Sequence, residues 1–193
     1  MDVPAQLHDE LSATRELLIA QLREHALIIG EVTLTSGAKA SYYVDAKRAI
    51  LRPTGFHALA RLLAIYGDSV KATAVGGMTM GADPVACAAL AGGLDAKGFF
   101  VRKQAKAHGL QRRIEGPLLS LEDRCLVVED VVTTGGSTLA AIEALKEAGH
   151  RICGVISVLD RLAGAGPEIE QAAGARYFPL ATIDDVYPTR PDK

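Results

Sequence analysis

The hydrophobic residues of this chain follow two different spacings. Between residues 7 and 26, leucines recur every 3–4 positions, which predicts an amphipathic N-terminal helix. The same spacing predicts further helices in 52–67, 82–92, 139–149 and after 167. Short apolar runs without this spacing lie between them and predict buried strands. These runs are 72–75, 97–101, 124–128, 152–159 and 175–180.

Strands that alternate with helices predict an α/β fold, in which one parallel sheet is covered by helices on both faces. Ahead of this core, residues 32–34 and 41–45 flank a turn and predict a β-hairpin. The 193 residues suffice for a single domain with a sizeable core. We expect the N-terminal helix and hairpin in 1–50, the core in 51–182, and a tail with a frayed end in 183–193.

Composition excludes several classes of protein. Hydrophobic residues make up 49% of the chain, and the formal net charge of −2 gives no reason to expect nucleic acid or an anionic membrane as partner. No apolar run approaches the ~18–20 residues that span a bilayer, and no signal peptide is visible. Cys87, Cys125 and Cys153 lie in apolar runs without a close pair, so we expect buried, reduced thiols and neither a disulfide nor a metal site.

The stretch 124–138 carries the strongest chemical signal. A Val-rich run precedes two adjacent carboxylates, Glu129 and Asp130, at the point where the strand is expected to end. The small residues Thr133-Thr134-Gly135-Gly136-Ser137 follow, and then a helix begins near Leu139. The alternative is a surface acidic pair followed by an ordinary turn. It does not account for two carboxylates directly behind a buried strand, and the absence of Lys-Ser or Lys-Thr excludes a Walker A loop.

This order of residues suits a phosphorylated sugar. A helix N-terminus leaves backbone N–H groups unpaired and carries partial positive charge. Glycines let these groups surround an anion, so the loop 133–137 is suited to a phosphate monoester. Carboxylates beside the phosphate would repel it, so we expect Glu129 and Asp130 to accept hydrogen bonds from sugar hydroxyls a short distance away. A ligand with both features is a ribose 5-phosphate.

Two more segments carry candidate chemistry. A glycine-rich loop at 76–81 lies between a predicted strand and a predicted helix, which on these residues alone fits either an anion site or a tight turn. Residues 102–116 contain five basic residues and a histidine with no clear period, which predicts a surface loop. In a chain of net negative charge, this local positive charge favours a lid over a polyanion rather than an ordinary solvated loop.

Parallel α/β sheets bind ligands outside the carboxyl ends of their strands. Four predicted strands of this chain end in candidate groups, which are Gly76-Gly77, Arg102-Lys103, Glu129-Asp130 and Asp160-Arg161. We therefore expect these groups to surround one crevice.

With these motifs identified, the chain resembles the orotate phosphoribosyltransferases along nearly its whole length. Residues 129–137 are similar to the family's motif for phosphoribosyl pyrophosphate (PRPP), and 76–84 to its pyrophosphate loop. The pattern Arg-Lys-x-x-Lys-x-His-Gly at 102–109 is similar to the mobile catalytic loop and is the motif most particular to the family. Residues 35–43 resemble its N-terminal hood. The resemblance implies a type I phosphoribosyltransferase fold, with a mostly parallel central sheet, helices on both faces and a small N-terminal hood.

The resemblance also implies roles for individual residues. Catalytic roles fall to Lys106, His108 and Asp130. The residues that bind PRPP are Arg102, Lys103, Lys106, His108, Glu129, Asp130, Val131, Val132, Thr133, Thr134, Gly135, Gly136 and Ser137. Those that bind orotate are Thr133, Arg161 and Tyr43. No residue is expected as a metal ligand, because Mg²⁺, the implied cofactor, would be held by the substrate and water.

The implied reaction joins orotate to PRPP and yields orotidine 5′-monophosphate and pyrophosphate, a step of pyrimidine biosynthesis. In the family the lid reaches into the site of a neighbouring subunit, so a homodimer with shared active sites is implied. We expect no nucleic-acid or membrane partner and a cytoplasmic location.

Two positions depart from the family's pattern. Thr35 stands where the enzymes commonly carry lysine, and Thr79-Met80 stands in place of a Tyr-Lys pair in the pyrophosphate loop. Two cations near the substrate are therefore missing. We predict that Lys106 and His108 stabilise more of the transition-state charge here.

Two other functions share part of this pattern. An adenine- or xanthine-type purine phosphoribosyltransferase would share the central motif but not the lid pattern. A non-catalytic PRPP-sensing regulator would usually carry an added nucleic-acid-binding segment or basic face, and this sequence shows neither.

Overall fold

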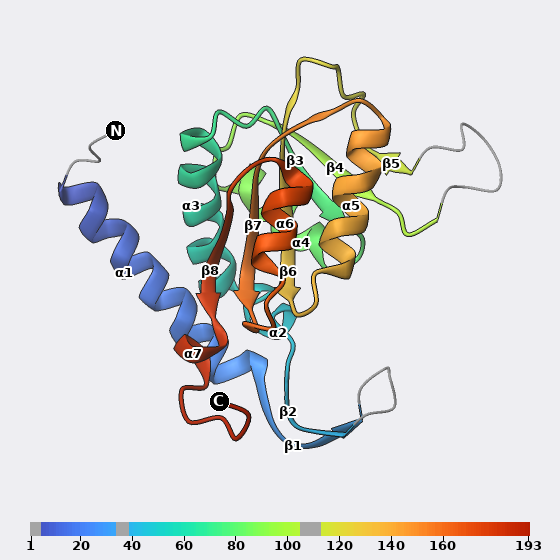
Figure 1. Ribbon diagram of the computed structural model, residues 1–193. Coiled ribbons are helices and arrows are strands. Elements are labelled where there is room, and N and C mark those ends of the chain that lie inside the picture. Colours follow the sequence, from blue (N-terminus) through green and yellow to red (C-terminus); the bar gives the residue numbers. More distant parts are fainter. Residues whose placement is uncertain (1–4, 34–38, 105–112) are drawn as a thin grey trace.

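The computed structural model describes residues 5–33, 39–104 and 113–193. Within these residues, a six-stranded sheet has the order β5-β4-β3-β6-β7-β8 (Figure 1). All neighbouring strands are parallel except the short β5, which is antiparallel to β4. The strands are β3 (Ala74–Met78), β4 (Lys97–Val101), β5 (Ile114–Glu115), β6 (Arg124–Val132), β7 (Arg151–Asp160) and β8 (Tyr177–Thr182). The predicted parallel α/β sheet is confirmed.

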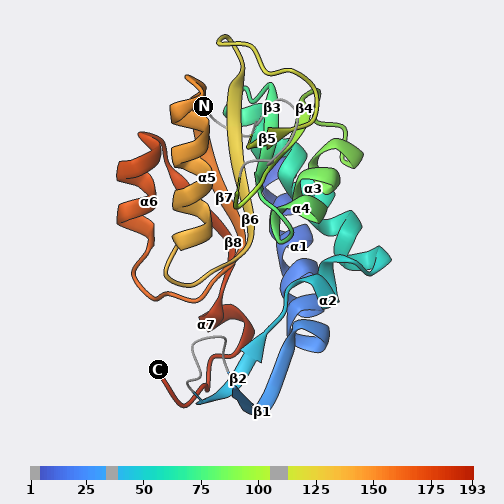
Figure 2. The same ribbon diagram turned by 90° about the vertical axis from the view of Figure 1, so that its right-hand side faces the viewer.

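Helices cover both faces of this sheet, as Figure 2 shows with the sheet seen on edge. One face carries α5 (Gly136–Glu147) and α6 (Gly166–Ala173), and the other carries α3 (Pro53–Ser69) and α4 (Ala82–Ala91). The N-terminal helix α1 (Ala5–Gln21) packs against α3. Apolar side chains fill both interfaces and form two separate buried clusters. The hydrophobic effect on both faces therefore fixes the central strands and holds the strand ends in place.

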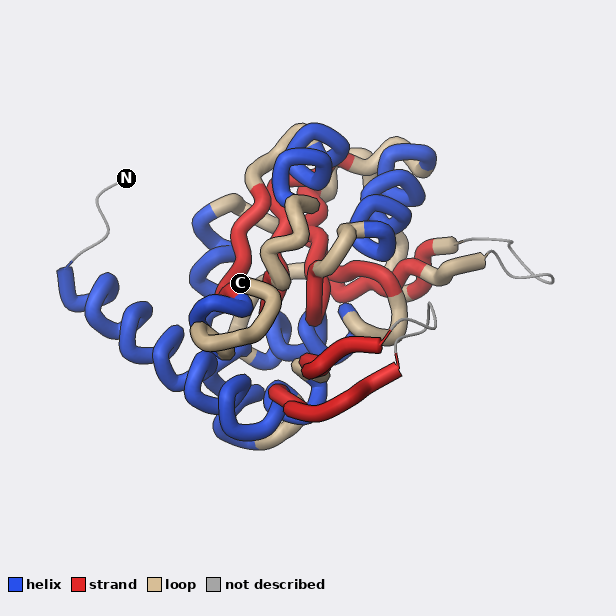
Figure 3. Tube along the Cα trace, turned by 60° about the horizontal axis from the view of Figure 1, so that its bottom comes forward, coloured by secondary structure: helices blue, strands red, loops and turns tan. Residues whose placement is uncertain are grey.

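The N-terminal part forms a small unit of its own. After α1, a π-helical turn (Leu22–Ala26) leads into β1 (Leu27–Thr33), which pairs antiparallel with β2 (Lys39–Val44). The predicted hairpin is confirmed, with longer strands than expected, and its turn lies outside the described residues. Figure 1 shows it apart from the main sheet, on the side where β6, β7 and β8 end, and Figure 3 shows its two strands side by side. The short helix α2 (Lys47–Ile50), which was not predicted, follows directly.

The C-terminal tail packs against the hairpin, so the prediction of a frayed end was wrong. A capping box between Thr182 and Asp185 starts the short helix α7 (Ile183–Val186). Beyond it, the Tyr42 hydroxyl donates to Asp192 Oδ2 at 3.0 Å, and the Tyr42 and Tyr187 rings meet edge to face at 5.4 Å. The tail is held because its polar and aromatic groups find partners on a part of the chain about 150 residues away.

The structure bears on two expectations from composition, which concern membrane-spanning helices and the cysteines. No helix within 5–33, 39–104 or 113–193 is long and apolar enough to cross a membrane. All three cysteines are free thiols, with Cys125 buried and Cys153 partly buried. The prediction was wrong for Cys87, which is exposed on α4.

Candidate active site

The acidic pair lies within the central strand rather than behind it. β6 continues to Val132, which pairs with Asp160 of β7, so the predicted end of the strand before Glu129 was wrong. Glu129 is 4% exposed and Asp130 is 8% exposed. The backbone N–H of Val131 donates to Asp130 Oδ1 at 2.8 Å. The two carboxylates are therefore held by a central, paired strand of the sheet.

Burial and mutual repulsion decide the protonation of this pair. Burial, followed by the negative charge of Asp130, raises the pKa of Glu129 from 4.5 to about 8. The hydroxyl of Thr138, in the first turn of α5, donates to Glu129 Oε2 at 3.5 Å. Glu129 is therefore mainly protonated at neutral pH.

Lys47 supplies the counter-charge for Asp130. Its Nζ lies 2.7 Å from Asp130 Oδ2 and 3.2 Å from Asp45 Oδ1. Burial acts to lower the pKa of Lys47, but hydrogen bonds and charge from the two aspartates outweigh it, so the pKa is raised. The sequence did not indicate this contact, because Lys47 lies 83 positions from Asp130 and belongs to none of the motifs.

The loop after β6 surrounds a cavity at the N-terminus of α5, where the sequence predicts an anion site. Gly135 has a positive φ of 80°, which glycine adopts without strain, and the helix α5 begins at Gly136. A cavity of about 270 Å³ opens at this helix N-terminus. Its lining residues are Glu129, Val131, Val132, Thr133, Thr134, Gly135, Gly136, Ser137 and Thr138. The predicted PRPP-binding residues of this motif, except Asp130, line the cavity, and Asp130 lies beside it in β6.

The second glycine-rich loop reaches the same acidic pair. A Cβ atom placed on Gly81 would lie 2.5 Å from Asp130 Oδ1 and 2.9 Å from Glu129 Oε1. Only glycine allows this approach. Thr79 donates its hydroxyl to Asp83 Oδ2 at 2.7 Å, and Met80 is exposed. The structure therefore brings the loops that follow β3 and β6 together, as the predicted crevice requires.

The basic residues at the end of β4 border the loop that follows β3. Arg102 and Lys103 line a cavity of about 660 Å³ together with Thr79 and Glu115. Arg102 Nη1 lies 3.4 Å from Glu115 Oε1. The predicted catalytic residues Lys106 and His108 lie outside the described residues, as does Thr35, so their roles stay predictions.

The arginine at the end of β7 faces the N-terminal hairpin. The Arg161 backbone N–H donates to Val132 O at 2.9 Å, which ties it to the end of β6. Its guanidinium lies over the ring of Tyr42, 4.8 Å from the centroid. Its Nε is buried and has no hydrogen-bond partner among the described residues. Tyr43, the predicted orotate contact, is the exposed neighbour on β2, so the structure brings Tyr42 rather than Tyr43 to Arg161.

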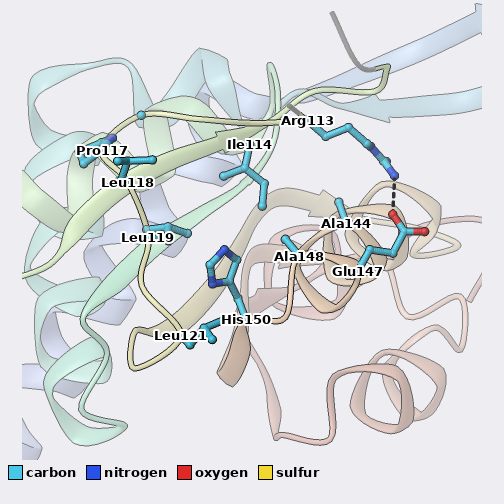
Figure 4. Close-up of a pocket in the computed structure, with 11 residues that line it drawn as sticks. Arg113, Ile114, Pro117, Leu118, Leu119, Leu121, Ala144, Glu147, Ala148 and His150 are labelled. Atoms are coloured by element: carbon cyan, nitrogen blue, oxygen red, sulfur yellow. Dashed lines mark ion pairs between the residues drawn. The ribbon is translucent and has the colours of Figure 1, made fainter. Parts of the chain in front are cut away.

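A different cavity lies near the far end of α5 (Figure 4). It measures about 500 Å³ and lies between the loop 116–121 and the last turns of the helix. Its lining is largely aliphatic, and an ion pair at 3.7 Å joins Arg113 to Glu147 at its edge. The acidic pair and both glycine-rich loops lie elsewhere, so we place the active site at the N-terminus of α5.

Comparison with known proteins identifies the family. Residues 49–175 match the model of the phosphoribosyl transferase domain. The chain is 47% identical to the orotate phosphoribosyltransferase of Streptomyces avermitilis over 167 residues, which cover 84% of this chain and 91% of that protein. This chain belongs to the orotate phosphoribosyltransferase family. A second relative, the orotate phosphoribosyltransferase of Corynebacterium glutamicum, is also 47% identical, over 89% of this chain and 93% of its own length.

Solved structures of orotate phosphoribosyltransferases have the same fold. The Mycobacterium tuberculosis enzyme in complex with Fe(III) dicitrate aligns with a TM-score of 0.81 at 41% identity, over 90% of this chain and 99% of that one. The same enzyme in complex with PRPP aligns with a TM-score of 0.76 at 36% identity, over 90% and 98%. An adenine phosphoribosyltransferase from Leishmania donovani is only 13% identical, with a TM-score of 0.68, and shares the fold alone.

Proposed function

We infer that this chain transfers the ribose 5-phosphate group of PRPP to orotate, giving orotidine 5′-monophosphate and pyrophosphate in pyrimidine synthesis. One observation carries the assignment of the site. The buried Glu129-Asp130 pair lies between the cavity of about 270 Å³ at the N-terminus of α5 and the backbone of Gly81. The relatives at 47% identity supply the identity of the base.

PRPP fits this site with its 5-phosphate at the N-terminus of α5 and its diphosphate at the end of β4. Its 5-phosphate occupies the loop 133–137, where backbone N–H groups and hydroxyls donate to it. Its ribose hydroxyls reach the acidic pair, and Asp130 accepts their hydrogen bonds. The diphosphate then points to the loop around Gly81 and to Arg102 and Lys103 at the end of β4.

The chemistry requires stabilisation of separated charge. The bond from C1′ to the pyrophosphate oxygen breaks and its electron pair leaves with pyrophosphate. The ring nitrogen of orotate forms the new bond to C1′ and releases its proton to water or to the departing pyrophosphate. The ribose gains oxocarbenium character while negative charge grows on the leaving group. Fixed cations in a site shielded from water stabilise that charge best, and we assign this task to Arg102, Lys103, Lys106 and His108.

Arg161 suits the carboxylate of orotate. An arginine donates charge-assisted hydrogen bonds to a carboxylate, and the Nε of Arg161 has no protein partner among the described residues. The Tyr42 ring holds the guanidinium in place from one side. We propose Thr133, in the adjacent loop, as a second orotate contact.

The donor set fits a Mg²⁺ ion that is carried by the substrate. No group of three or more His, Cys, Asp or Glu side chains suited to a metal is found in 5–33, 39–104 and 113–193. Mg²⁺ keeps several waters and commonly binds substrate phosphates, so pyrophosphate oxygens and water would hold it here. When bound, it neutralises the growing charge of the leaving group.

We propose a homodimer and a cytoplasmic location. The lid pattern at 102–109 supports the dimer, because in the family this loop reaches into the neighbouring subunit's site. Arg102 and Lys103 of the same chain already border the site. In a dimer, the loop of the neighbouring subunit would add its basic groups to them.

An absorbance assay tests the function directly. Orotate, PRPP and Mg²⁺ incubated with the protein should give a loss of orotate absorbance and stoichiometric pyrophosphate, whereas adenine or xanthine in place of orotate should give neither. Turnover of a purine but not of orotate would establish the alternative enzyme. PRPP binding without turnover of any base would support a regulator instead.

A further inference from the structure

The salt bridge between Lys47 and Asp130 joins two parts of the site that are distant in sequence. Lys47 is the first residue of α2, directly behind the hairpin, and Asp130 lies in the central strand. The Nζ to Oδ2 distance is 2.7 Å, and the Asp130 side chain is only 11% exposed. The Lys47 side chain is 39% exposed, so burial of the carboxylate reduces the screening of this salt bridge by solvent from one side only.

Lys47 is itself held in position. Asp45 accepts a hydrogen bond from the Lys47 backbone N–H at 3.2 Å and lies 3.2 Å from its Nζ. The Asp45 backbone N–H donates to Ala26 O at 3.0 Å, and Ala49 and Ile50 of α2 are fully buried. The backbone that carries the Lys47 side chain is therefore fixed in a packed turn, and Asp45 holds the ammonium group.

Both oxygens of Asp130 are engaged by the protein. Oδ1 accepts the N–H of Val131 at 2.8 Å and faces Gly81, while Oδ2 faces Lys47. This fixes the plane of the carboxylate. The Asp130 backbone N–H donates to Glu129 Oε1 at 3.3 Å, which holds the two carboxylates next to each other in β6.

We propose that Lys47 is a positioning residue for PRPP, which holds the Asp130 carboxylate in the orientation that accepts the ribose hydroxyls. The inference rests on the proposed PRPP site. It assigns a function to a cation that lies outside the recognised motifs, in a chain whose hood and pyrophosphate loop lack two lysines common in the family.

The chain offers a matched control for this salt bridge. Lys97 Nζ lies 2.8 Å from Asp123 Oδ2, with side chains 41% and 8% exposed, against 39% and 11% for Lys47 and Asp130. Lys97 and Asp123 lie at the amino ends of β4 and β6, whereas Asp130 lies near the carboxyl end of β6. Loss of either lysine leaves a buried carboxylate without its cation. Of the two carboxylates, only Asp130 faces the proposed PRPP site.

The test compares Lys47→Met, Lys47→Arg and Lys97→Met in the orotate and PRPP assay. We expect Lys47→Met to raise the KM for PRPP about tenfold or more, because loss of one partner of a buried charge pair typically weakens binding by at least that factor. The KM for orotate should change little, Lys47→Arg should restore most of the affinity for PRPP, and Lys97→Met should leave both KM values near those of the unmodified enzyme.

The outcomes separate this inference from the proposed function. If the unmodified enzyme turns over no orotate, the proposed function is wrong. If it is active and Lys47→Met binds PRPP normally, or if Lys97→Met loses PRPP affinity equally, the positioning role alone is overturned. If circular dichroism shows that Lys47→Met does not fold, Lys47→Gln takes its place, and its KM for PRPP decides in the same way.

Discussion

The guanidinium of Arg161 lies over the ring of Tyr42, 4.8 Å from its centroid. Tyr42 is buried in β2 and is held from behind by Tyr187 and Asp192 of the C-terminal tail. The hairpin and the tail therefore act together on one arginine at the carboxyl end of β7. This contact orients the side chain that we assign to the carboxylate of orotate.

Removal of the Tyr42 ring should weaken orotate binding selectively. We expect Tyr42→Leu to raise the KM for orotate roughly five- to tenfold, because a desolvated cation–π contact is worth about 1–2 kcal/mol. Tyr42→Phe keeps the ring and loses only the hydrogen bond to Asp192, so it should stay close to the unmodified enzyme. Steady-state kinetics with each substrate varied in turn measures both. An equal rise in the KM for PRPP would show that the ring acts on the fold rather than on Arg161.

The raised pKa of Glu129 makes stability depend on pH. The folded chain holds this proton up to about pH 8, whereas the unfolded chain releases it near 4.5. The proton therefore stabilises the fold fully below pH 4.5, and this stabilisation is lost as pH rises through about 8. Glu129→Gln stays neutral, so its free energy of unfolding should fall less over this interval, by on the order of 5 kcal/mol, since each pKa unit corresponds to about 1.4 kcal/mol. Urea unfolding at several pH values checks this, and parallel pH profiles for the two proteins would contradict it.

A methyl group at Gly81 should disturb the acidic pair. Its Cβ would lie 2.5 Å from Asp130 Oδ1, which is far inside van der Waals contact. Overpacking typically costs about 1–3 kcal/mol, so we expect Gly81→Ala to raise the KM for PRPP roughly tenfold. Gly166→Ala is the control, because its Cβ would meet Tyr177 at an ordinary 3.4 Å. Normal PRPP affinity in Gly81→Ala would mean that the two loops are free to separate.

The lid prediction comes from the sequence alone. With two family lysines replaced at Thr35 and Met80, Lys106 should stabilise much of the leaving-group charge. We expect Lys106→Ala to lower kcat by about a hundredfold, since the loss of one fixed donor to a developing charge commonly costs that much. Lys146→Ala, at the far end of α5, should leave kcat unchanged. Near-normal turnover of Lys106→Ala would refute the prediction.

Features that depend on residues close together in the sequence could be predicted from it. The strand, acidic pair, small-residue loop and helix of 124–147 form one continuous segment, and each part follows from local propensity and from the needs of an anion. The end of β6 was misplaced because pairing with β7 continues past Glu129 and outweighs the local polarity of the two carboxylates. The contact between Tyr42 and Arg161 could not be predicted, because adjacent strand residues face opposite sides and the sequence does not say which side faces Arg161. The role of Tyr43 in orotate binding stays a prediction.

By itself, the amino-acid order determined the α/β class, the family and the small-residue loop that precedes α5, because periodicity and contiguous motifs record them directly. Tertiary structure alone decided that Lys47 meets Asp130 across 83 positions and that Gly81 lies against the same carboxylate. It also decided that the tail supports Tyr42. These contacts arise where packing on both faces of the sheet brings distant segments to the carboxyl ends of its strands, and no local pattern encodes which residues meet there.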